Sequence, residues 1–115
     1  MQIVTKRVYE DYDSDGGKRI LVDRLWPRGI SKEKLKIDLW LKEIAPSNEL
    51  RKWFNHESEK WDKFKELYFK ELNGNEVLVE QLLDLAKNER LIFLYSAKDE
   101  IHNQAVAFKE YLFNR

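Results

Sequence analysis

Two short and almost continuous apolar runs, within residues 19–23 and 90–95, are the strongest structural signal in this 115-residue sequence. Such runs are typical of strands that are covered on both faces, as in parallel sheets. A third segment, residues 2–9, is rich in β-branched residues and is also expected to form a strand. Because such apolar strands are covered by the helices expected between and after them, we expect a mainly parallel sheet.

Apolar residues recur at helical spacing between these strands. The expected helices lie at about 47–55, 58–72 and 76–88, with a last helix entered from residues 96–99. Ser31 is expected to cap a brief helical turn through Leu35, and residues 37–45 fit a strand and a helix equally well. This order predicts an α/β fold: a small, mainly parallel sheet of three to four strands with helices on both faces, in a single domain over residues 1–115.

Net charge, cysteine content and the length of apolar stretches exclude or disfavour several classes of function. Lys plus Arg and Asp plus Glu both number 21, so the formal net charge is zero. General nucleic-acid binders usually carry a basic excess, so nucleic acid is not an expected partner. The absence of cysteine excludes disulfides, thiolate nucleophiles and cysteine-based metal centres. No apolar stretch approaches the ~20 residues that span a membrane, and no signal-peptide core is evident, so we expect a cytoplasmic protein without membrane contact.

Metal or cofactor binding has little support in the sequence. Alternating aspartates within residues 11–15 precede Gly16 as in a calcium loop, but Val22 stands where that motif requires a glutamate. The chain's two histidines, His56 and His102, match no common zinc-binding spacing. We therefore expect no metal and no cofactor.

Two segments that follow strands are expected to carry the functional site, because ligands of open parallel sheets bind beyond the carboxyl ends of the strands. In residues 24–29, Arg24 and Arg28 flank a tryptophan and a proline, and guanidinium groups bind carboxylate or phosphate oxygens in pairs. In residues 96–103, Lys98 adds positive charge beside an expected helix N-terminus, which favours an anion. Convergence of the two segments would create a site for a small anionic, phosphate-like ligand. The candidate ligand-binding residues are Arg24, Arg28, Lys98, Asn103 and Ser47, and the candidate catalytic residues are Asp99 and His102.

The candidate polar residues have both functional and structural interpretations. His102, expected in the first helical turn, could transfer a proton near neutral pH, as could Asp99. Asn103 and Ser47 would orient ligand groups by hydrogen bonding. The competing structural roles are N-capping by Asp99, backbone hydrogen bonding by His102 and ion pairing by the arginines. The four tryptophans are expected in the core.

Residues 19–29 read RILVDRLWPRG, and this string resembles the YeaO-like family of uncharacterised bacterial proteins. Further matching segments lie at 40–47, 50–56 and 94–103, so the resemblance covers nearly the whole chain. The family is a domain of unknown function, so the resemblance implies no activity. It does imply a set of motif residues, many of them polar and in expected loops. In this chain they are Asp23, Arg24, Trp26, Pro27, Arg28, Gly29, Ala45, Pro46, Ser47, Arg51, His56, Lys98, Asp99, His102 and Asn103.

Three functions remain open at this point. The first is a small-molecule site for an anionic ligand, with or without catalysis. The alternative is a protein-interaction or stress-accessory domain without catalysis, for which the aromatic-rich residues 47–72 would supply a surface. A nucleic-acid-binding regulator is less favoured because of the neutral charge. Distant relatives often carry a cysteine near the turn after the last strand, and this chain has none, so thiol chemistry does not transfer to it.

Overall fold

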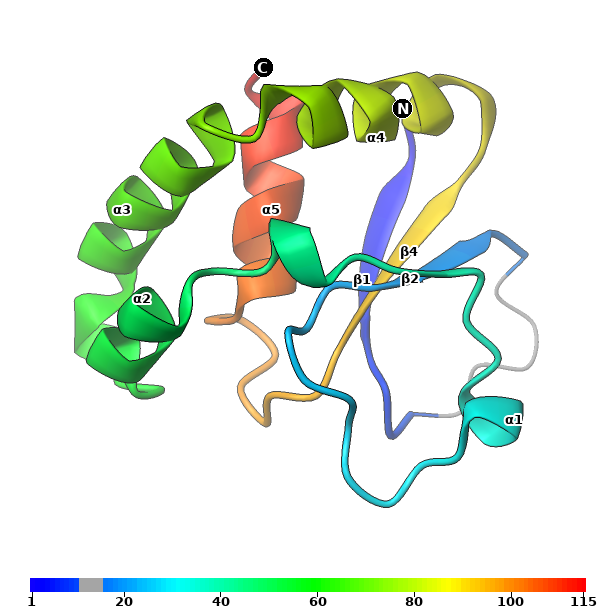
Figure 1. Cartoon of the computed structure of the whole chain (residues 1–115), viewed down its shortest axis with the longest axis horizontal. Helices are drawn as coiled ribbons and strands as arrows, with labels where there is room; N and C mark the ends of the chain where they lie inside the picture. Colours follow the sequence, from blue (N-terminus) through cyan, green and yellow to red (C-terminus); the bar gives the residue numbers. More distant parts are fainter. Residues whose placement is uncertain (11–15) are drawn as a thin grey trace.

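A four-stranded parallel sheet forms the centre of the computed structural model, which describes residues 1–10 and 16–115 (Figure 1). In spatial order the strands are β1 (Ile3–Arg7), β4 (Leu91–Tyr95), β2 (Lys18–Leu21) and β3 (Leu39–Trp40). Every pairing is parallel, with Ile20 opposite Phe93 in the central pair. All five residues of β4 are buried, as a central strand flanked on both sides requires. The predicted fold class is confirmed.

Five α-helices accompany the sheet within the described residues. They are α1 (Lys32–Leu35), α2 (Asn48–Phe54), α3 (Trp61–Asn73), α4 (Glu76–Asn88) and α5 (Gln104–Phe113), with 3₁₀ turns at Lys42–Ile44 and Ser58–Lys60. None of the helices described in residues 1–10 and 16–115 is both long and apolar enough to cross a bilayer.

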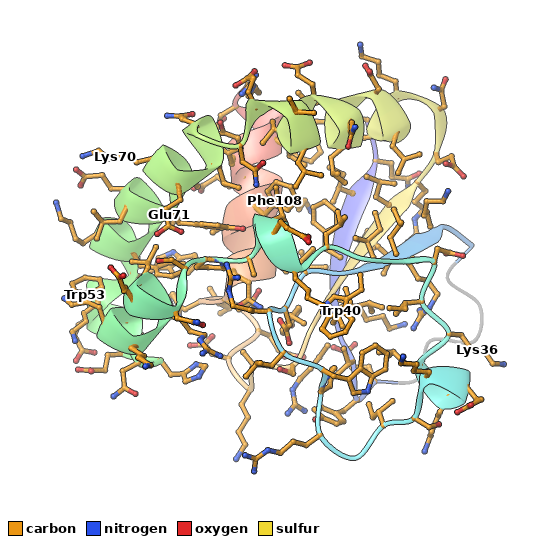
Figure 2. The ribbon with its side chains drawn as sticks, in the orientation of Figure 1. Lys36, Trp40, Trp53, Lys70, Glu71 and Phe108 are labelled. Atoms are coloured by element: carbon orange, nitrogen blue, oxygen red, sulfur yellow. The ribbon has the colours of Figure 1, made fainter. Side chains whose placement is uncertain are left out.

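The two faces of the sheet are covered differently. The larger core packs α3, α4 and α5 on one face, where Phe108 of α5, labelled in Figure 2, stacks on Phe93 of β4 with ring centroids 5.0 Å apart. The smaller core on the other face contains Leu35 of α1, with Trp26 and Trp40 packed against it. Figure 1 shows α1 standing apart from the longer helices. Loop residues thus cover much of the second face, and they lead directly to the carboxyl end of β2.

The expected elements differ from the observed ones at two places that matter for the site. The ambiguous segment 37–45 divides into the short strand β3 and a 3₁₀ turn. The last helix begins later than expected, because the side chain of Asn103 accepts a hydrogen bond from the Val106 amide and caps α5 there. His102 therefore lies in a loop before the helix, and its predicted place in the first helical turn is wrong.

Two further expectations concern residues away from the site. Trp53 is exposed on α2, so the expectation that all four tryptophans belong to the core is wrong for this one. The possible calcium loop falls largely on residues 11–15, which lie outside the described residues.

Candidate functional site

A pocket of ≈ 770 Å³ opens where β2 and β4 end. Residues 23–28, which follow β2, line one part of it, and residues 96–99 and 102–104, which follow β4, line another. The expected convergence of these two distant segments is therefore present in the structure. The physical cause is the parallel pairing of β2 with β4, which places both carboxyl ends at one edge of the sheet.

Asp23 joins the two segments at the base of the pocket. Its carboxylate accepts hydrogen bonds from the backbone amide of Ser96 (3.0 Å), from the Ser96 hydroxyl (2.6 Å) and from the side-chain amide of Gln104. Asp23 is only 7% exposed, and this burial raises its pKa, while the Ser96 hydrogen bonds and the charge of Arg51 act in the opposite direction. Asp23 was not among the predicted site residues, yet it holds the loop after β4 against the loop after β2.

The two predicted arginines have different environments. The guanidinium of Arg24 donates to the backbone carbonyls of Pro46 (3.2 Å) and Ala45 (3.1 Å), so it fixes the segment before α2 as a wall of the pocket. Arg28 has an exposed side chain, and its backbone carbonyl accepts a hydrogen bond from the Tyr9 hydroxyl (2.8 Å). Lys98, also exposed, lines the pocket from the opposite segment. Arg28 and Lys98 are thus the more accessible charges of the predicted set.

Asp99 and His102 form a hydrogen-bonded pair. One carboxylate oxygen of Asp99 accepts from the backbone amides of Ile101 and His102 (both 2.9 Å), and the other lies 2.9 Å from Nδ1 of His102. These hydrogen bonds lower the pKa of Asp99 to about 2. Since an ionised carboxylate only accepts hydrogen bonds, Nδ1 of His102 is the donor in this pair, and Nε2 takes no part in it. The ring also packs against Trp61 in a T-shaped arrangement, with ring centroids 5.3 Å apart, which restrains its orientation further.

The lowered pKa of Asp99 predicts a pH dependence of stability. A carboxyl group whose folded-state pKa lies below its unfolded value stabilises the fold above the unfolded value, here about 4, and that contribution disappears as the pH falls toward about 2. Water screens this half-exposed group, so we expect Asp99→Ala to cost on the order of 1 kcal/mol at pH 7. Chemical denaturation between pH 2 and pH 7 measures the difference from the parent protein. A difference that stays constant over this range would show that ionisation of Asp99 plays no part.

The remaining two predicted residues have structural environments. Asn103 is buried, its side-chain amide donates to the Asp99 carbonyl (2.9 Å), and its side-chain oxygen caps α5. Ser47 caps α2 and donates its hydroxyl to Glu71 of α3 (2.6 Å), which is labelled in Figure 2. Ser47 does not line the pocket. The structure therefore gives no support to the expectation that Ser47 orients a ligand there, because its hydroxyl links two helices instead.

Three basic residues line the pocket without having been assigned to the site from the sequence. Arg7 lies at the end of β1 and donates to the Ala97 carbonyl (3.0 Å), and Arg51 comes from α2. His56 follows Asn55, and both have positive φ angles (55° and 48°), which non-glycine residues adopt at a cost. Arg7 could have been predicted to line the pocket by the argument used for Arg24, because β1 also ends at this edge of the sheet.

The pocket concentrates positive charge in a chain that is neutral as a whole. Its lining contains five Arg or Lys residues and two Asp residues, which gives a formal charge of +3 with both histidines neutral. The five basic residues are Arg7, Arg24, Arg28, Arg51 and Lys98. No cluster of three or more possible metal ligands occurs within residues 1–10 and 16–115.

Fold and pocket together define a small α/β protein with a positively charged pocket at the carboxyl ends of parallel strands. The chain belongs to the family described as the inactive DUF488-N3 subclade, whose model matches residues 2–115. It is 47% identical over 112 residues to the uncharacterised protein YeaO of Escherichia coli (strain K12), and the match covers 97% of each chain. An uncharacterised protein of Mycobacterium tuberculosis (strain ATCC 25618 / H37Rv) is 49% identical over 74 residues, which is 64% of this chain and 63% of that protein. No solved structure gives a significant match. The resemblance to the YeaO-like family is confirmed.

Proposed function

We propose that this chain binds a small anionic ligand in the pocket between residues 23–28 and 96–104. The observation that carries this proposal is the formal charge of +3 on the pocket lining of a chain whose net charge is zero. Charged groups inside a concave surface focus the electrostatic potential and attract a ligand of opposite charge. Arg28 and Lys98 approach from different segments, so a single oxyanion group could be bound by both.

The basic residues of the pocket differ in how much freedom they lose on binding. Two backbone carbonyls already fix the guanidinium of Arg24, and one carbonyl fixes that of Arg7. These side chains therefore lose little further conformational entropy when a ligand binds. Arg28 and Lys98 are exposed and would become ordered on binding. Arg24 and Arg7 therefore supply a fixed positive field, while Arg28 and Lys98 supply direct contacts.

We further propose that the pocket binds its ligand without converting it. The family is described as an inactive subclade, and the chain has no cysteine that could act as a nucleophile. A carboxyl group with a pKa of about 2 has no proton to donate near neutral pH, so Asp99 is unsuited to general acid catalysis. In this account Asp99 orients His102, whose Nε2 accepts a hydrogen bond from a hydroxyl or N–H group of the ligand.

Replacing Arg28 with alanine tests the proposal. We expect Arg28→Ala to weaken the binding of inorganic phosphate by roughly 10- to 100-fold, the range for losing a charge-assisted hydrogen bond. Folding should be retained, because the Tyr9 hydroxyl is bound by the backbone of Arg28 and not by its side chain. Isothermal titration calorimetry measures the affinity, and thermal unfolding checks the fold.

A matched control is available on α2. Lys52 is exposed, lies next to Arg51 in the sequence and does not line the pocket, so Lys52→Ala removes the same formal charge at another place. We expect phosphate affinity to change little in this variant. If Arg28→Ala and Lys52→Ala lost the same phosphate affinity, binding would depend on the overall charge of the protein and not on the pocket. Absence of phosphate binding by the parent protein, even at millimolar concentrations, would contradict the proposal.

A further inference from the structure

We infer that the ligand is an organic anion, in which a phosphate or carboxylate group is joined to an apolar body. This inference rests on the proposed anion binding and specifies the class of ligand. The first argument is size. A pocket of ≈ 770 Å³ lies within the range of about 300–1,000 Å³ that is typical of sites for organic molecules. An inorganic oxyanion would fill only a small part of it.

The second argument is the apolar surface at the mouth of the pocket. Leu25 and Tyr9 both line the pocket, and they are 61% and 45% exposed. Tyr9 is tied to the loop after β2 through its hydrogen bond to the Arg28 carbonyl, so the two apolar side chains and Arg28 belong to one rim. The Arg7 guanidinium lies 4.8 Å from the centre of the Tyr9 ring. Apolar surface and positive charge therefore occur together at the place where a ligand would enter.

The third argument is the composition of the inner wall. Phe54 of α2 and Phe64 of α3 line the pocket, and their ring centroids are 4.4 Å apart. Both are buried, as are Ala45 and Pro46, which Arg24 holds in place. These buried side chains give the pocket an apolar floor, and a free phosphate ion would leave the exposed Leu25 and Tyr9 facing water. A ligand with an apolar body would cover them, and burying apolar surface stabilises the complex.

Comparing phenyl phosphate with inorganic phosphate tests this inference on the intact protein. Both carry the same charged group, and only phenyl phosphate has a planar apolar body. We expect phenyl phosphate to bind roughly tenfold more tightly, which corresponds to burying part of one ring. Isothermal titration calorimetry at one pH and ionic strength provides both dissociation constants.

Two exposed aliphatic residues provide a matched pair of variants. Leu25→Ser removes apolar surface at the rim, and Val77→Ser removes it from α4, where Val77 is 72% exposed and does not line the pocket. We expect Leu25→Ser to weaken phenyl phosphate binding roughly fivefold and to leave inorganic phosphate binding unchanged. Val77→Ser should change neither. Because both side chains are exposed, both variants should fold like the parent.

The outcomes separate this inference from the proposal on which it rests. If the parent protein bound phenyl phosphate and inorganic phosphate with equal affinity, the inference of an apolar organic part would be contradicted. The proposal of anion binding would stand. Tighter binding of phenyl phosphate that Leu25→Ser does not reduce would also overturn it, because the rim would then play no part. Absence of inorganic phosphate binding would overturn the proposed function itself, whether or not phenyl phosphate binds.

Discussion

Replacing Asp23 with alanine is expected to lower the free energy of unfolding by about 3 kcal/mol, because three hydrogen-bond donors lose their acceptor. These donors are the amide and hydroxyl of Ser96 and the side-chain amide of Gln104. Burial raises the pKa of Asp23, which means that keeping this carboxylate ionised in the fold already has a cost. The alanine variant no longer has this desolvation cost, so its loss of unfolding free energy is smaller than three broken charge-assisted hydrogen bonds would give.

Chemical denaturation of Asp23→Ala measures this effect, with Asp84→Ala as its control. Asp84 is an exposed aspartate on α4 that pairs with Lys87, and its replacement should change the stability by no more than about 0.5 kcal/mol. We also expect Asp23→Ala to weaken phosphate binding, since the loops on either side of the pocket lose their link. A variant as stable as the parent would show that Asp23 does not hold these loops together.

Replacing Phe108 with alanine is expected to have a still larger effect, a loss of about 3–5 kcal/mol. Phe108 is fully buried and stacks on Phe93, which is fully buried in the central strand, with their planes 14° apart. Alanine would leave a cavity between α5 and the sheet, which the surrounding core can fill only in part. Since small domains are stabilised by only about 5–15 kcal/mol, much of the total would be lost.

Phe113 offers a control on the same helix for the Phe108 variant. Its ring is half-exposed, so Phe113→Ala should cost less than about 1 kcal/mol. Phe108→Leu, which fills most of the cavity, should fall between the two alanine variants. Urea denaturation of the three variants gives the comparison. Similar losses for Phe108→Ala and Phe113→Ala would contradict the packing of α5 against β4 that places residues 96–104 at the pocket.

The strands and the helical segments were predictable because their signals are local. The apolar run at 90–95 identifies the buried central strand, and the spacing at 76–88 identifies α4 with its observed bounds. The segment 37–45 was ambiguous because its short strand and 3₁₀ turn are too brief to show a period. Tertiary pairing with β2 decides its structure, and that pairing is not visible in the sequence.

The location of the pocket was predictable from the sequence, but not all of the residues that line it. Parallel topology was enough to place Arg28 and Lys98 on the lining of one pocket, because it fixes where strands end. The helix-linking contact of Ser47 is not visible in the sequence, because its partner Glu71 lies on another helix and 24 positions away. The role of Asp23 was missed for the same reason, since its partners Ser96 and Gln104 come from the far end of the chain. Hydrogen bonds between distant segments depend on the fold as a whole, and no local sequence pattern predicts them.

A titration of the isotope-labelled protein with phosphate, followed by amide chemical shifts, tests the central claim most directly. We predict saturable shifts concentrated in residues 23–28 and 96–104, with smaller shifts near Arg7 and Arg51, and a strong reduction of all of them in Arg28→Ala. Shifts that are absent, that do not saturate, or that gather away from both segments would contradict an anion site in this pocket.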